Sequence, residues 1–187
     1  MAQIEQRTIG VLGIASGMGV THLVIALADY SVSCRRRKTA VVELSGNHTL
    51  EKLTGTSEPF EWNRIMFYPN FPKHRAAELR SRDYEVVIFD MGSCYYRVRT
   101  EFLYCDRKLV LGSLAPWRKM DYYSFVQEEM EEDRYARGVV FLEKNGIKKE
   151  KKEFLRRLGQ PVYSVPILRE ARLTEEGQRS MFNDIVP

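Results

Sequence analysis

Residues 9–22 read Ile9-Gly10-Val11-Leu12-Gly13-Ile14-Ala15-Ser16-Gly17-Met18-Gly19-Val20-Thr21-His22. The stretch opens with apolar, strand-forming residues, Gly17 and Gly19 follow, and helical spacing begins at Thr21. A strand, a glycine-bearing loop and a helix in this order form a phosphate-binding loop, in which backbone N–H groups and the helix N-terminus point at an anion. The stretch therefore predicts a strand–loop–helix unit able to hold phosphate.

The loop lacks the charged residue that usually accompanies this layout. In the pattern G-x-x-x-x-G-K-[ST], the lysine neutralises the outer phosphates and the hydroxyl reaches magnesium. Thr21 stands at the hydroxyl position, but Val20 occupies the lysine position and Ile14 replaces the first glycine. Taken alone, the loop therefore fails this motif. If a nucleotide binds, its candidate contacts in the loop are Ser16, Gly17, Met18, Gly19, Val20, Thr21 and His22.

Apolar, β-prone runs recur along the chain with helical segments between them. The runs lie at 8–14, 39–44, 65–68, 85–89, 108–111, 138–142 and 162–165, and the helical segments at 21–33, 73–82, 121–135 and 148–158. Several runs are continuous, as in Val86-Val87-Ile88-Phe89, which is typical of strands buried on both faces of a parallel sheet. The pattern predicts an α/β fold of about seven strands, a three-layer sandwich with a mostly parallel sheet.

Length and composition predict one domain over residues 1–187. Hydrophobic residues make up 44% of the chain, enough for one three-layer core, and no repeat or low-complexity linker divides it. Lys and Arg number 29 against 25 Asp and Glu, and this mild excess gives no clear argument for nucleic acid.

The cysteines and the apolar runs predict a cytoplasmic protein. Cys34, Cys94 and Cys105 are odd in number and lack metal-like spacing, so neither a disulfide framework nor a zinc site is expected. The N-terminus lacks the features of a signal peptide, and no apolar run reaches membrane-spanning length. We therefore expect no transmembrane segment.

The loop and a later strand together resemble the MinD/ParA group of P-loop ATPases. The deviant loop of that group reads K-G-G-x-G-K-[ST], and the matching stretch 15–21 has Ala15 and Val20 at the two lysine positions. The run 84–92 resembles the strand that ends in the magnesium-binding aspartate of the group, which is Asp90 here. The resemblance implies a P-loop NTPase-like fold.

Four further segments follow in the order of that group. Segment 41–47 resembles its second strand, but Ser45 replaces the aspartate at the strand end and Glu43 lies inside the strand. The others are 105–116, a strand with a proline-containing loop; 138–145, a strand followed by an asparagine near the base; and 161–167, the last strand and its proline turn. By this resemblance, Asn145 is a candidate base contact.

The resemblance also implies ligands, partners and a role. It implies ATP or ADP with Mg²⁺, Thr21 and Asp90 as the metal-binding residues, a homodimer across the site, and protein partners that bring the chain to the inner face of the membrane. Among the group, the TadZ/CpaE type, which acts in pilus assembly and polar positioning, is most similar. Because Ala15 and Val20 carry no charge, we expect weak or absent ATP hydrolysis and a regulatory, positioning or assembly role.

Two other functions stay open at this point. The stretch 13–19 also fits the G-x-x-x-G-x-G loop of short-chain dehydrogenases, where Glu43 would hold a ribose hydroxyl of NAD(P). Tyr104 and Lys108 form a Y-x-x-x-K pair, but Lys108 is predicted in a strand, where this spacing does not bring side chains together as on a helix.

The third interpretation is a scaffold that uses no nucleotide. The sequence also leaves open whether a distant arginine, such as Arg97 or Arg118, replaces the lost lysines.

Overall fold

The computed structural model describes residues 6–130, 138–144, 146–165 and 182–183. Its strands are β1 (Arg7–Gly13), β2 (Thr39–Glu43), β3 (Phe60–Trp62), β4 (Ile65–Tyr68), β5 (Val86–Asp90), β6 (Arg107–Ser113), β7 (Val139–Lys144) and β8 (Val162–Ser164). Its helices are α1 (Val20–Ser33), α2 (Thr49–Thr54), the 3₁₀ helix η1 (Lys73–Ser81), α3 (Tyr95–Leu103), α4 (Lys119–Ser124), the π-helix η2 (Phe125–Met130) and α5 (Lys148–Leu158).

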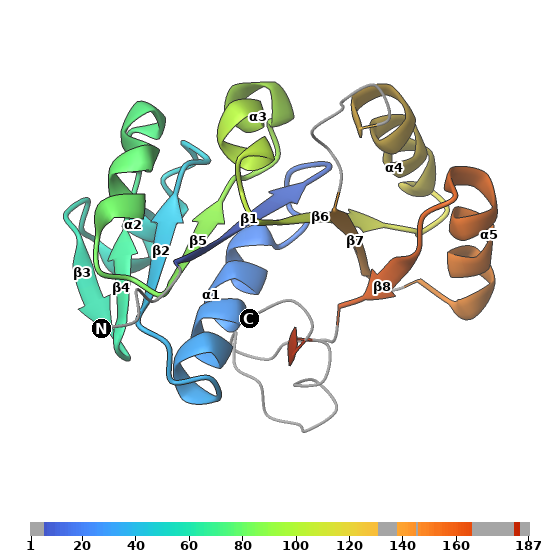
Figure 1. Cartoon of the computed structure of the whole chain (residues 1–187). Coiled ribbons are helices and arrows are strands. Elements are labelled where there is room, and N and C mark those ends of the chain that lie inside the picture. The colour runs from blue at the N-terminus through green and yellow to red at the C-terminus, as the bar shows by residue number, and fades with distance from the viewer. Residues whose placement is uncertain (1–5, 131–137, 145, 166–181, 184–187) are drawn as a thin grey trace.

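Within these residues one sheet of eight strands runs through the molecule in the order β3-β4-β2-β5-β1-β6-β7-β8 (Figure 1). Every neighbouring pair is parallel except β3 and β4, which form an antiparallel hairpin at one edge. The strand β1 therefore lies in the middle of the sheet, with β5 on one side and β6 on the other. This position brings the carboxyl ends of β1, β5 and β6 together at one edge of the sheet.

The two faces of the sheet carry two separate hydrophobic cores. In β5, Val86 and Ile88 point into one core, and Val87 and Phe89 point into the other, as the alternation of a strand requires. The first core is closed by α1 and by Leu50 of α2, and the second by η1, α3, α4 and α5 (Figure 1). The predicted three-layer α/β sandwich with a mostly parallel sheet is confirmed.

The prediction of about seven strands was wrong by one, because it missed β3. The hairpin between β3 and β4 turns at Asn63 and Arg64, which both adopt positive φ, at 51° and 66°. Such turns usually contain glycine, which this one lacks. Stacking of Phe60 on Phe67, with ring centroids 5.1 Å apart, holds the short strand in place.

Four helical segments also differ from the prediction. Helices α2 and α3 were not predicted, although Tyr95, Val98 and Phe102 of α3 are buried at helical spacing. Segment 73–82 is a 3₁₀ helix that ends at Ser81. Segment 121–135 begins earlier, at Lys119, and continues as a π-helix from Phe125, while its residues 131–135 lie outside the described part. Among the described helices, none combines the length and apolar composition of a membrane span.

Candidate functional site

The predicted phosphate-binding loop lies between β1 and α1, at the carboxyl edge of the sheet. Two backbone hydrogen bonds fix its entrance to the neighbouring strand ends: the Gly13 N–H donates to the Gly92 carbonyl at 2.8 Å, and the Ile14 N–H donates to the Leu111 carbonyl at 3.0 Å. The side chain of Val20 packs so closely over Gly13 that a Cβ there would lie 2.8 Å from its Cγ2 atom. The loop is therefore held tightly where it leaves β1 and where it enters α1.

The backbone of the loop turns in a way that leaves its N–H groups available. Gly17 and Gly19 adopt φ of 77° and 82°, a left-handed conformation that favours glycine. Across the part of the chain that the structure describes, the N–H groups of residues 16–20 donate to no backbone or side-chain acceptor. Consecutive free N–H groups at the start of a helix are the donors that an anion requires.

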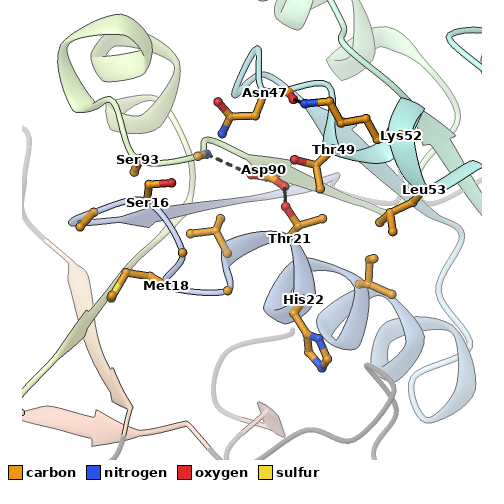
Figure 2. A pocket seen from close by; sticks show the side chains of 16 residues that line it. Ser16, Met18, Thr21, His22, Asn47, Thr49, Lys52, Leu53, Asp90 and Ser93 are labelled. Atoms are coloured by element: carbon orange, nitrogen blue, oxygen red, sulfur yellow. Dashed lines mark hydrogen bonds between the residues drawn. The ribbon is translucent and has the colours of Figure 1, made fainter.

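A cavity of about 630 Å³ opens over this loop (Figure 2). One wall is the loop and the first turns of α1, the floor is the end of β5, and the other wall is the segment that contains α2. Its lining comprises Ala15, Ser16, Gly17, Met18, Gly19, Val20, Thr21, His22, Ile25, Asn47, Thr49, Lys52, Leu53, Asp90, Gly92 and Ser93. Asp90 carries the only carboxylate among these described residues.

Thr21 and Asp90 meet at the floor of the cavity. The Thr21 hydroxyl donates a hydrogen bond of 2.5 Å to the Asp90 carboxylate, which also accepts the Gly92 N–H at 3.0 Å (Figure 2). Asp90 is only 1% exposed. Burial raises the pKa of Asp90 to about 6; the two hydrogen bonds oppose this rise, and the nearby Glu43 carboxylate adds to it.

The oxygens of Thr21 and Asp90 suit a magnesium ion that is held jointly with a phosphate ligand. Mg²⁺ prefers oxygen ligands, and proteins usually bind it through one or two carboxylates plus substrate phosphates. Within the described residues no group of three or more His, Cys, Asp or Glu side chains forms a site made by the protein alone. The donors present therefore fit a shared site at the end of the loop.

The position of Glu43 corrects two expectations. One is that Glu43 lies inside its strand, and the other is that it could hold a ribose hydroxyl. It is the last residue of β2, not an interior one, and it is fully buried. Its carboxylate accepts the N–H groups of Thr49 at 2.6 Å, Asn70 at 3.2 Å and Leu50 at 3.3 Å, and the Ser45 hydroxyl at 3.3 Å. Because these donors occupy the carboxylate, Glu43 cannot hold a ribose hydroxyl as the dehydrogenase interpretation requires.

Tyr104 and Lys108, the pair that the dehydrogenase interpretation requires, do not lie on one helix. Tyr104 is 71% exposed beyond the end of α3, whereas Lys108 is buried within β6, as predicted. The two residues lie on different elements, so they do not form the helical pair that this chemistry uses. The geometry gives the dehydrogenase interpretation no support beyond the glycine loop.

Each predicted loop residue, from Ser16 to His22, lines the cavity. Their roles differ, since Val20 is buried against Gly13 and the His22 ring points away from Asp90 (Figure 2). Asn145, the predicted base contact, lies outside the described residues.

Sequence reasoning missed the wall formed around α2. Asn47, Thr49 and Lys52 line it, and the Lys52 ammonium donates to the Asn47 carbonyl at 2.9 Å (Figure 2). The Arg97 guanidinium packs against Gly46 just outside this wall. A helix signal over 49–54, with Glu51 in its first turn and Gly55 after its end, was present in the sequence.

Comparisons with known proteins agree with this architecture. No protein-family model and no curated protein matches the chain. A ParA-family ATPase from Chlorobium tepidum TLS superposes with a TM-score of 0.67 at 13% identity, over 88% of this chain and 85% of that one. A putative plasmid partition protein from Borrelia burgdorferi B31, bound to AMPPNP, superposes with a TM-score of 0.66 at 12% identity, over 97% of this chain and 98% of that one.

The MinC:MinD cell division complex from Aquifex aeolicus contains a chain that superposes with a TM-score of 0.63 at 11% identity, over 95% of this chain and 86% of that one. The order of motifs in the sequence and these superpositions agree. The fold of this chain is that of the ParA and MinD P-loop ATPases.

Proposed function

We propose that this chain binds an adenine nucleotide with Mg²⁺ in the cavity over the 14–19 loop, and that it acts as a nucleotide-dependent switch with little or no hydrolysis. The observation that carries the proposal is the conjunction of free N–H groups at residues 16–20 with the Thr21–Asp90 pair at one end of the same cavity. Free amides suit phosphate, and the paired oxygens suit the metal that accompanies it.

The binding roles follow from the positions of the side chains. The loop N–H groups would hold the phosphates, while Thr21 and Asp90 would hold the magnesium, which would offset phosphate charge when bound. Lys52 on the opposite wall adds a positive charge within the cavity. AMPPNP in the Borrelia burgdorferi relative supports a nucleotide as the ligand of this fold.

Weak hydrolysis follows from the lack of a group to activate water. Asp90 is the only carboxylate among the described lining residues, and its partners are Thr21 and Gly92. Glu43 is buried under four donors. Ser45 stands where the sequence resemblance implies an aspartate. Positioning and charge stabilisation supply most of the catalysis in phosphoryl transfer, and here both are reduced.

A regulatory, positioning or assembly role fits a site that binds without rapid turnover. The MinC:MinD complex supports a protein partner. A homodimer across the site and attachment to the inner face of the membrane through partners remain predictions from the sequence resemblance. The pilus-assembly subtype remains a prediction from the sequence.

Calorimetric titration of the chain with ATP, ADP and NAD(H), with and without Mg²⁺, tests this function. We expect magnesium-dependent binding of ATP or ADP that is lost in Asp90→Ala and retained in Asp121→Ala, which removes an exposed carboxylate of α4. Binding of NAD(H) would favour the dehydrogenase. If no ligand binds to the wild type, the scaffold interpretation replaces the switch.

Hydrolysis is tested separately by phosphate release from ATP. We expect no release above the rate of a heat-denatured sample. A measurable rate that falls strongly in Asp90→Ala would show that the site is an active ATPase.

A further inference from the structure

A lysine from another strand reaches the phosphate-binding loop. Lys144 is the last residue of β7, and its ammonium lies directly beside Gly19: a Cβ built on Gly19 would be 2.8 Å from Nζ and 3.8 Å from Cε. Gly19 is the residue before α1 and belongs to the lining of the cavity. The contact therefore places a cation at the helix N-terminus, where the loop N–H groups lie.

The sheet explains how Lys144 reaches this position. The end of β7 pairs with the end of β6 at Ser113, and β6 pairs with β1, so all three strands end at the same edge. Leu142, two residues earlier, packs in the core on the α1 face. Alternation along the strand directs Lys144 to that same face, toward α1 and its preceding loop.

The Lys144 ammonium is not committed to another group. Among the residues that the structure describes, it has no hydrogen-bond acceptor and no carboxylate partner. Lys119, by contrast, pairs with Glu153 at 3.7 Å, and Lys52 donates to the Asn47 carbonyl. A half-buried, uncommitted ammonium beside free N–H groups favours an anion as its partner.

The loop has no cation of its own to offer. Ala15 has no charge, and the Val20 side chain is buried against Gly13, so neither lysine position of the related loops contributes one. Like Lys144, the two arginines considered from the sequence are absent from the described lining of the cavity. Arg97 packs against Gly46, whereas the atoms within 4 Å of a Cβ built on the loop residue Gly19 belong to Lys144.

We propose that Lys144 replaces the missing loop lysine and binds the polyphosphate group of the nucleotide from the β7 side. This assignment rests on the proposed function, because it names a further residue of the same site. It also gives Gly19 a second reason to be glycine, since a side chain there would displace the Lys144 ammonium as well as strain the backbone.

The test compares Lys144→Gln with Lys148→Gln, which removes an exposed lysine at the start of α5 and changes the net charge equally. Affinity for ADP with Mg²⁺ and for inorganic tripolyphosphate is measured by calorimetry at several salt concentrations. A lost hydrogen bond to a charged group predicts that Lys144→Gln weakens binding by about tenfold or more. We also expect Lys144→Gln to flatten the salt dependence, and Lys144→Arg to restore most of the affinity.

Each outcome has a separate meaning. If the wild type binds and Lys144→Gln binds equally well with an unchanged salt dependence, the Lys144 assignment is wrong and the nucleotide site stands. If Lys144→Gln and Lys148→Gln weaken binding equally, the effect is one of net charge, which also overturns the assignment. If the wild type binds neither ADP nor tripolyphosphate, the proposed function fails, and the role of Lys144 fails with it. Thermal unfolding of each variant confirms that the proteins compared are folded.

Discussion

The Thr21 hydroxyl and the Asp90 carboxylate join the first turn of α1 to the end of β5 through a partly buried hydrogen bond of 2.5 Å. The bond connects two segments far apart in the sequence at the floor of the cavity. It also holds a carboxylate where ionisation is unfavourable, because Asp90 is almost fully removed from water. The stability of the protein and the chemistry of the site are therefore linked through one side chain.

Replacement of Asp90 by asparagine should stabilise the fold at neutral and alkaline pH. With a pKa of about 6 in the folded state against an ordinary 3.8, folded Asp90 binds more protons than unfolded Asp90 between these values. The free energy of unfolding therefore falls as pH rises from about 4 to about 6, by at most about 3 kcal/mol. We expect Asp90→Asn to be more stable than the wild type at pH 8 in urea denaturation and to lose this advantage at pH 4. A less stable variant at pH 8 would contradict the argument.

The pKa of Asp106 is shifted in the opposite direction to the pKa of Asp90. Partial burial raises its pKa, but the Thr8 hydroxyl and N–H, which donate at 2.7 and 2.8 Å, outweigh burial and lower the pKa below its ordinary value. The ionised Asp106 carboxylate therefore stabilises the folded state at pH values above its pKa in the unfolded chain. This stabilisation is lost as pH falls through its pKa in the folded state. We expect Asp106→Asn to lose about 1 kcal/mol at pH 7 and little at pH 3. Equal losses at both values would rule out the charge as the cause.

Glu43→Gln should loosen the wall of the cavity that contains α2. The buried carboxylate accepts three backbone N–H groups, and the amide of glutamine would turn a donor toward some of them. An unsatisfied buried donor costs roughly 1–3 kcal/mol. Hydrogen exchange should rise at the amides of Thr49, Leu50 and Asn70, while the amides of β1 keep their protection. Unchanged exchange at Thr49 would mean that Glu43 does not hold α2.

Nucleotide should stabilise the wild type in a magnesium-dependent way. A ligand present at a hundred times its dissociation constant adds about 2.7 kcal/mol to the free energy of unfolding. We expect this gain with ADP and Mg²⁺, its reduction on addition of EDTA, and its loss in Asp90→Asn, although that variant is more stable without ligand. A gain in Asp90→Asn as large as in the wild type would remove Asp90 from the metal site.

The parts of the fold that local sequence determines were predictable. The strand–loop–helix unit at 9–22 and the buried strand that ends at Asp90 follow from apolar runs and glycine positions, and the structure places both as expected. The hairpin at Asn63 and Arg64 was not predictable in this way, because non-glycine residues adopt positive φ there only with tertiary support such as the stacking of Phe60 on Phe67.

The parts of the site that depend on tertiary structure were not predictable from motifs. The position of Glu43 in the sequence suggested a ligand contact, but the segments around Thr49 and Asn70 fold back over its carboxylate. Likewise, Lys144 follows an ordinary strand, and only the strand order brings its ammonium to Gly19. Local patterns describe the loop, whereas the charges around it depend on which strands are neighbours.

The position of Lys144 has a consequence for how such sites are recognised and rebuilt. A cation carried by β7 is attached to the loop through β6, so the geometry of the phosphate site depends on the pairing of three strands rather than on a run of consecutive residues. Grafting residues 9–22 alone onto another protein would transfer the amides and leave the charge behind. A graft that retains the phosphate site would have to include the three paired strands β1, β6 and β7.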